Sequence, residues 1–166
     1  NAVPANPAMR FPEAVERTEA LLDNALQIRL RSDVPIGCFL SGGVDSSLIV
    51  AKTTQALGGS FHTYSIGFDD PAHDETPFIE RVLARYRTQH HHRRLDSSCL
   101  EQLPAIVYSY SELLGDASTV PMYFVSEAAK QELRVVLTGD GADEVFGGYI
   151  DPFALHLAAR YRQVPA

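Results

Sequence analysis

The stretch SGGVDSS, at residues 41–47, combines residue types suited to binding an anion. Two adjacent glycines leave backbone N–H groups accessible, and a helix starting at this point would aim its N-terminus at the same place. Ser46 and Ser47 add hydroxyl donors. The loop has no lysine, so it is not a Walker A phosphate loop, and it also lacks the spaced glycines of a dinucleotide-binding fingerprint. A bare phosphate would be repelled by Asp45, so we expect an intervening Mg²⁺ ion.

A second glycine-rich loop, TGDGADEVFGGY at residues 138–149, has the same character. It carries Asp140 and Asp143, and Asp143 is the natural second carboxylate for a magnesium ion held by Asp45. A short glycine-rich pattern alone also fits an ordinary strand-to-helix turn. The presence of two such loops favours a binding site.

The apolar pattern between these loops alternates between helical and strand periods. Helices are predicted at residues 12–31, 45–57, 74–86, 98–114, 122–132 and 153–162, and buried strands at 34–40, 61–68, 90–95 and 134–139. The alternation predicts an open α/β fold, with a parallel sheet covered by helices on both faces. In such sheets ligands bind beyond the carboxyl ends of the strands, where the strand order reverses. A strand order of 3-2-1-4 would place the two loops opposite each other.

Composition limits the classes of function. With 166 residues, 45% of them hydrophobic, we expect one globular unit, and no apolar stretch is long enough to span a membrane. The net charge of −7 argues against a nucleic-acid partner. Two widely spaced cysteines favour a reducing compartment, so we expect a cytoplasmic protein without a zinc site.

Several other residues allow both a structural and a functional interpretation. The run His90 to His92 is expected to be structural, because consecutive strand residues point to opposite faces and cannot all converge on one metal. Asp74 and Glu75 fit a functional role and a helix N-terminus equally well. Cys38 lies within the first predicted strand and is expected to be a core residue.

Four stretches in this order, SDVPIGCFLSGGVDSS, YSIGFDDPAHDE, STVPMYFVSEAA and VVLTGDGADEVFGGY, closely resemble the synthetase domain of glutamine-hydrolysing asparagine synthetases. The resemblance covers approximately residues 11–149. That family belongs to the ATP pyrophosphatases, with an adenine nucleotide alpha hydrolase-like fold. It implies that aspartate attacks the α phosphate of ATP, which gives β-aspartyl-AMP and pyrophosphate, and that ammonia then yields asparagine.

The resemblance also implies residue roles. Pyrophosphate would be bound by Ser41, Gly42, Gly43, Ser46 and Ser47, and Mg²⁺ by Asp45 and Asp143. The adenosine part of ATP would contact Leu40, Ile66, Thr138 and Gly139. Asp140 would handle the proton when ammonia attacks, a step to which a carboxylate is suited.

The chain departs from the family pattern in places. We expect residues 1–10 to be an extension or a cloning remnant, and residues 11–166 to be a synthetase domain that is truncated at its C-terminal end. A glutaminase domain of the parent chain is an expected partner, and a homodimer is an expected assembly. Ser111-Glu112-Leu113 replaces an Asp-Glu-Pro sequence common among relatives. This keeps open a β-lactam synthetase-like enzyme with another acceptor, and a non-catalytic nucleotide-binding module.

Overall fold

A four-stranded parallel sheet forms the centre of the computed structural model, which describes residues 9–58, 61–111, 115–149, 158 and 160–162. The strands are β1 (Ile36–Phe39), β2 (His62–Phe68), β3 (Gln89–Leu95) and β4 (Val135–Leu137), in the order β3-β2-β1-β4. All three strand pairs are parallel. The predicted order, 3-2-1-4, is therefore confirmed.

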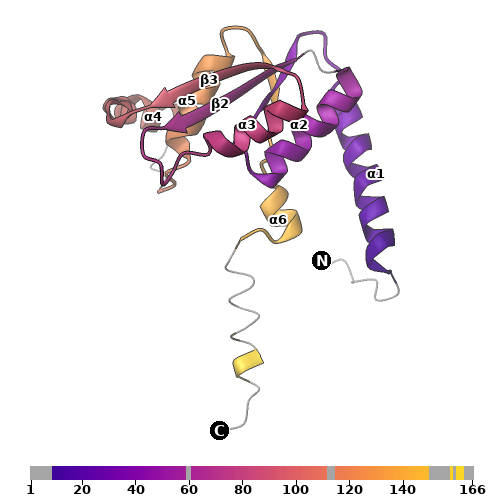
Figure 1. The fold of residues 1–166 in the computed structure, drawn as a ribbon. Helices are drawn as coiled ribbons and strands as arrows, with labels where there is room; N and C mark the ends of the chain where they lie inside the picture. Colours follow the sequence, from indigo (N-terminus) through magenta and orange to yellow (C-terminus); the bar gives the residue numbers. More distant parts are fainter. Residues whose placement is uncertain (1–8, 59–60, 112–114, 150–157, 159, 163–166) are drawn as a thin grey trace.

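Helices cover both faces of the sheet, as predicted (Figure 1). One face packs against α1 (Phe11–Arg29), α2 (Val44–Leu57) and α3 (Thr76–Arg85), and the other against α4 (Leu103–Tyr110) and α5 (Thr119–Ala129). Of the helices in the described ranges, none has the length and apolar character required to span a membrane.

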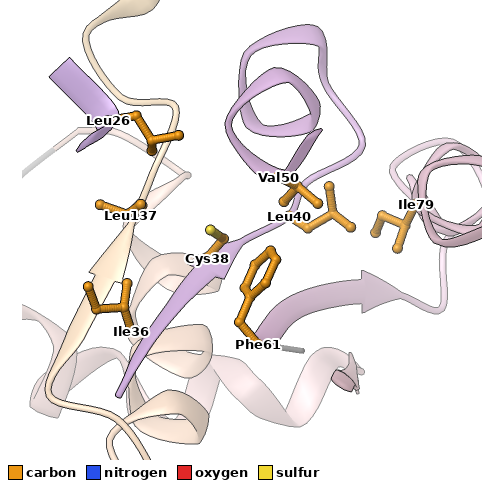
Figure 2. Packing of buried hydrophobic residues seen from close by; sticks show 8 residues of the cluster. All are labelled: Leu26, Ile36, Cys38, Leu40, Val50, Phe61, Ile79 and Leu137. Carbon is orange, nitrogen blue, oxygen red and sulfur yellow. The ribbon is translucent and has the colours of Figure 1, made fainter. Parts of the chain in front are cut away.

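The core on the α1–α2–α3 face fixes the start of the first glycine-rich loop (Figure 2). Cys38 and Leu40 extend from β1 and the residue after it toward Val50 of α2 and Ile79 of α3, and at most 1% of each of these four residues is exposed. Burying side chains of this size contributes roughly 1.5–3 kcal/mol each. The loop that follows Leu40 is therefore anchored to a rigid part of the fold.

The side chains of β2 alternate between the two faces of the sheet, as the strand period requires. Thr63 and Ser65 face His90 and form hydrogen bonds with its ring nitrogens, Nδ1 at 2.9 Å and Nε2 at 3.1 Å respectively. Tyr64 points the other way, into a cluster with Val125 of α5. His62, Tyr64 and Ile66 of β2 therefore project from the face of the sheet that α5 covers.

Some predicted elements differ from the structure. The expected helix starting at residue 98 with a Ser98–Glu101 capping box is wrong: a 3₁₀ helix, η1 (Ser97–Gln102), begins first, and the side chain of Asp96 accepts a hydrogen bond from the Ser98 amide at 2.8 Å. That carboxylate supplies the cap two residues earlier than predicted. Helix α5 begins and ends three residues earlier than predicted.

The second glycine-rich loop contains a short helix that was not predicted, α6 (Ala142–Phe146), bounded by Gly141 and Gly147, which both have positive φ. Figure 1 shows α6 beyond the layers of the sheet and its helices. Most of the helix predicted at residues 153–162 lies outside the described residues, as do residues 1–8 of the predicted N-terminal extension and two residues of the 111–113 departure.

Candidate functional site

The first glycine-rich loop is held in shape by its own serines. The hydroxyls of Ser41 and Ser46 lie 2.9 Å apart, and the Ser41 amide donates to Ser46 Oγ at 3.2 Å. The Gly43 amide donates in turn to Ser41 Oγ at 3.3 Å, and Ser46 Oγ donates to the Gly43 carbonyl at the same distance. Ser46 is buried. Its hydroxyl therefore stabilises the loop from inside.

The two glycines of this loop have different roles. Gly42 has a φ of +86°, and a Cβ there would lie 2.9 Å from Cβ of Phe78 and 3.1 Å from the Ile79 amide nitrogen in α3. Gly43 is the N-cap residue of α2 and uses no side chain for capping. The first N–H groups of a helix have no acceptor within the helix and carry partial positive charge. The loop thus brings the N-terminus of α2 to the carboxyl end of β1.

The two glycine-rich loops are in direct contact. A Cβ at Gly139 would lie 2.8 Å from the Ser46 nitrogen and 3.0 Å from Cβ of Asp45. The contact follows from the strand order: β4 is paired in parallel with β1, so the loops after these two strands leave neighbouring carboxyl ends. The prediction that these loops face each other is confirmed.

A cleft of about 540 Å³ opens where the loops meet. Of the predicted site residues, four line it: Asp45, Thr138, Gly139 and Asp140. The remainder of its wall is largely apolar and comes from α1, α2 and α6, with Leu22, Ile49 and Val145 among the contributors. Two further hollows, one between α4 and α5 and one beside the end of β3, contain none of the predicted site residues.

The three acidic residues of the predicted site differ in position. Asp45 lies in the first turn of α2 and Asp140 is exposed, and both border the cleft. Asp143 is half-buried in α6, and its carboxylate lies against Gly148, where a Cβ would overlap it. The structure therefore brings Asp45 and Asp140 to one cleft and directs Asp143 toward the end of the second loop.

Three other predicted residues, Leu40, Ile66 and Ser47, do not line the cleft. Leu40 follows β1 directly, and its side chain belongs to the core, while its amide donates to the Tyr64 carbonyl at 2.9 Å. Ile66 lies within β2 and packs on the α5 face of the sheet. Ser47 is in the first turn of α2, where its amide donates to the Gly43 carbonyl at 3.1 Å. The adenosine contacts expected for Leu40 and Ile66 remain predictions.

Asp74 has a clear structural role at the start of α3. Its carboxylate accepts hydrogen bonds from the amide and hydroxyl of Thr76, which lower the pKa of Asp74, and the nearby Arg94 guanidinium lowers it further. Cys38 is fully buried, as expected for a core residue, and burial raises the pKa of its thiol to about 11. Such a thiol is a poor nucleophile at neutral pH.

The three consecutive histidines divide between the faces of the sheet, as predicted. His90 and His92 share Ser65 as a hydrogen-bonding partner, and burial lowers the pKa of His90 to about 4. His91 lies on the opposite face, where it meets His62 and Glu132. This second group was not predicted from the sequence, because its members lie 29 and 41 positions apart in the chain and no local pattern connects them.

Known proteins with similar sequences belong to one family. The family model described as asparagine synthase matches residues 17–165. A Methanocaldococcus jannaschii protein named "Putative asparagine synthetase [glutamine-hydrolyzing] 2" is 47% identical over 138 residues, which are 82% of this chain and 27% of that protein. Asparagine synthetase [glutamine-hydrolyzing] 1 of Bacillus subtilis is 36% identical over 135 residues, 81% of this chain and 21% of that protein.

The chain therefore spans about a quarter of the length of these curated relatives. Among solved structures, an NH3-dependent NAD synthetase from Campylobacter jejuni aligns with 85% of this chain and 61% of its own, at a TM-score of 0.46 and 15% identity. The family match extends over nearly all of the residues that build the sheet, the two glycine-rich loops and the cleft. The chain thus belongs to the asparagine synthase family.

Proposed function

We propose that this chain is the ATP-binding core of an asparagine synthetase. The protein that contains it would cleave ATP between the α and β phosphates, transfer AMP to the side-chain carboxylate of aspartate, and release asparagine after attack by ammonia. The observation that carries the proposal is the contact between Gly139 and the Asp45–Ser46 segment, since it joins a helix N-terminus and two carboxylates at one cleft.

The loop at residues 41–47 would bind the phosphates that leave as pyrophosphate. Backbone N–H groups at the N-terminus of α2 supply fixed positive potential, and the Ser47 hydroxyl adds a donor. Ser41 and Ser46 hold the loop through their mutual hydrogen bond. Because these groups are positioned before the substrate arrives, they need little reorganisation as charge develops on the leaving group.

The acidic residues fit a magnesium ion better than a bare phosphate. A carboxylate at the mouth of an anion-binding loop repels phosphate unless a cation lies between them, and Asp45 occupies that position. Asp45 would hold the ion through its carboxylate oxygens, which are the ligands that Mg²⁺ prefers, and Asp143 would join it by turning from Gly148 toward the cleft. When bound, Mg²⁺ neutralises charge on the transferring phosphates.

Asp140 is the candidate for proton handling in the amide-forming step. Its carboxylate is exposed at the cleft, and its amide donates to Thr138 Oγ1 at 3.4 Å, which fixes the backbone at the end of β4. A carboxylate in that position would accept the proton that the nitrogen of ammonia loses as it attacks the adenylated carboxyl carbon and AMP leaves. Aspartate and ammonia are thus the proposed co-substrates. A glutaminase domain is the proposed source of ammonia, and a homodimer the proposed assembly.

Binding is tested on the 166-residue chain by calorimetry with ATP in the presence and absence of Mg²⁺. We expect Asp45→Asn to reduce the Mg²⁺-dependent gain in affinity by at least about tenfold, or about 1.4 kcal/mol. Asp33→Asn is the matched control, because Asp33 is exposed in the turn before β1, at the N-terminal end of that strand. This variant should bind ATP with the same Mg²⁺ dependence as the unaltered chain. Equal Mg²⁺ dependence in both variants would exclude Asp45 as a magnesium ligand.

The reaction is tested on the protein that contains this chain, supplied with ATP, Mg²⁺, ammonia and one carboxylate acceptor at a time. AMP and pyrophosphate formed only with aspartate support the proposal. The same products formed with a different acceptor would favour the β-lactam synthetase-like alternative, whereas ADP and phosphate would exclude cleavage between the α and β phosphates. A protein that binds ATP but releases neither pair would be a nucleotide-binding module.

A further inference from the structure

His62, His91 and Glu132 bring three potential metal ligands together on the α5 face of the sheet. Nδ1 of His62 lies 2.9 Å from Nε2 of His91 and 3.0 Å from Oε2 of Glu132, and the third pair, His91 Nε2 and Glu132 Oε2, is separated by 3.5 Å. The three atoms therefore lie within 3.5 Å of one another. They are contributed by β2, by β3 and by the turn that follows α5.

One hydrogen bond does not account for this triangle. Nδ1 of His62 carries at most one hydrogen, yet it has two polar neighbours, Nε2 of His91 at 2.9 Å and Oε2 of Glu132 at 3.0 Å. A metal ion at the centre would use one lone pair from each of the three atoms. Tetrahedral zinc, with bonds of about 2.0–2.1 Å to nitrogen and oxygen, separates its ligand atoms by about 3.3–3.4 Å. The observed separations of 2.9, 3.0 and 3.5 Å are close to that spacing.

The fold holds these side chains in place. In the register of β2 and β3, Tyr64 pairs with His91, so His62, Tyr64 and His91 project from the same face. The His91 ring lies nearly parallel to its two neighbours, with ring centroids 5.1 Å from His62 and 4.6 Å from Tyr64. Helix α5 crosses β2 on this face (Figure 1), and hydrogen bonds to the Ala129 carbonyl fix the turn that carries Glu132.

Tyr64 supplies an outer contact of the kind that metal sites use to orient their ligands. Its hydroxyl donates to Oε2 of Glu132 at 2.9 Å, while the rest of the tyrosine is buried. An outer partner of this kind fixes the orientation of a ligating carboxylate, and its loss typically weakens metal binding 10–100-fold, as an order of magnitude. The arrangement therefore has both a ligand set and support for it.

We propose that His62, His91 and Glu132 form a binding site for a zinc-class divalent transition metal ion. Two imidazole nitrogens and one carboxylate oxygen suit Zn²⁺, Co²⁺, Ni²⁺ or Cu²⁺, whereas Mg²⁺ and Ca²⁺ prefer oxygen ligands throughout. The side chains are 27%, 39% and 48% exposed, respectively, so an ion can enter from solvent and a water molecule can complete its coordination. Once bound, the ion would link β2, β3 and the end of α5.

The metal site is separate from the proposed ATP site. His62 opens β2 and pairs with Gly37, whereas the glycine-rich loop begins at Ser41, four residues farther along the neighbouring strand. At the rise of a β-strand, four residues correspond to about 13 Å along the strand direction. The metal site therefore lies toward the N-terminal ends of the strands, and the glycine-rich loops lie at their carboxyl ends. The metal proposal therefore does not depend on the proposed function, and each can fail alone.

The test uses the untagged, metal-free 166-residue chain and calorimetric titration with Zn²⁺. We expect one ion per chain, with binding weakened more than about 100-fold in His91→Ala and Glu132→Gln, and about 10–100-fold in Tyr64→Phe. His73→Ala is the matched control, because His73 is a largely exposed histidine that hydrogen-bonds to Asp70 in a separate turn. It should bind Zn²⁺ as the unaltered chain does. Circular dichroism establishes that each variant is folded.

Co²⁺ reports the geometry independently, since a tetrahedral site gives strong visible absorption bands that His91→Ala should abolish. Zn²⁺ should also raise the melting temperature of the unaltered chain and leave that of Glu132→Gln unchanged, because an ion bound only to the folded state stabilises it. The proposal is overturned if the unaltered chain takes up no Zn²⁺, or if the folded variants bind it as tightly as His73→Ala does.

Discussion

The Gly139 α-carbon lies so close to the backbone of Ser46 that a methyl group at Gly139 would be 2.8 Å from the Ser46 nitrogen. Two segments almost a hundred residues apart are thereby packed against each other without an intervening side chain. The contact sets how far the N-terminus of α2 is from the Thr138–Asp140 segment. It therefore determines the width of the proposed phosphate site.

Replacing Gly139 by alanine should widen this site. The added methyl group meets backbone atoms, which yield less easily than the end of a side chain, so we expect a loss of about 1–3 kcal/mol in the free energy of unfolding. Mg²⁺-dependent ATP binding should weaken as well. Urea denaturation and calorimetry measure the two effects. Gly115→Ala is the control, since a Cβ at Gly115 has open space around it; a Gly139→Ala variant with the same behaviour would contradict the close approach of the loops.

Gly42→Ala tests how the first loop rests on α3. Gly42 and Gly58 both have positive φ, at +86° and +75°, so alanine strains the backbone at either position by about 1–2 kcal/mol. Only at Gly42 would the Cβ also press on Phe78 and the backbone of α3, because at Gly58 nothing lies within 4 Å. Denaturant unfolding should show a larger loss for Gly42→Ala than for Gly58→Ala. Equal losses would mean that α3 does not support the loop.

Asp74 should make the fold sensitive to acid. The hydrogen bonds from Thr76, together with the Arg94 guanidinium, lower the pKa of Asp74 in the folded chain below its value in the unfolded chain, near 3.9. The unfolded state therefore binds the proton more readily, so the stabilisation is present at neutral pH and is lost as pH falls below about 4. Urea midpoints at pH 6 and pH 3 should differ less in Asp74→Asn than in the unaltered chain. A difference of the same size in both would argue against the contribution of Asp74.

Cys38 should resist alkylation while the chain is folded. Burial raises the pKa of its thiol to about 11, so the reactive thiolate is scarce at pH 8, and the side chain is inaccessible to reagent. Mass spectrometry after iodoacetamide treatment should find Cys99, which is half-buried, modified well before Cys38. In denaturant the two should react at similar rates. Rapid modification of Cys38 in the folded chain would contradict its place in the core.

The fold was predictable from sequence because its signals are local. The run from Val34 to Leu40 is apolar throughout, as a strand buried on both faces must be, and it contains β1. Gly58 ended α2 as predicted, in the left-handed conformation that glycine favours. The capping of residues 96–102 was assigned wrongly, since Asp96 and Ser98 are both good N-cap residues and only the path of the chain after β3 selects Asp96.

The candidate site was predictable only in part. The two glycine-rich loops can be recognised from their composition, and the strand order places them next to each other. The sequence does not indicate the path of the second loop. The short helix α6 and the direction of the Asp143 carboxylate, toward Gly148, were therefore not predicted. Nor does any local pattern connect His62 with His91 and Glu132. That cluster arises from the pairing of β2 with β3 and from the point at which α5 ends.

We propose that the two glycine-rich loops together bind the phosphates of ATP. The most direct measurement is an NMR titration of the isotope-labelled 166-residue chain with ATP and Mg²⁺, following backbone amide resonances. The largest shifts should come from residues 41–47 and 138–141, and they should shrink in Asp45→Asn. The amide resonances of residues near His62, at the N-terminal end of β2, should stay nearly unchanged. Shifts centred anywhere else, such as the hollow between α4 and α5, or no shifts at all at saturating ATP, would contradict the account.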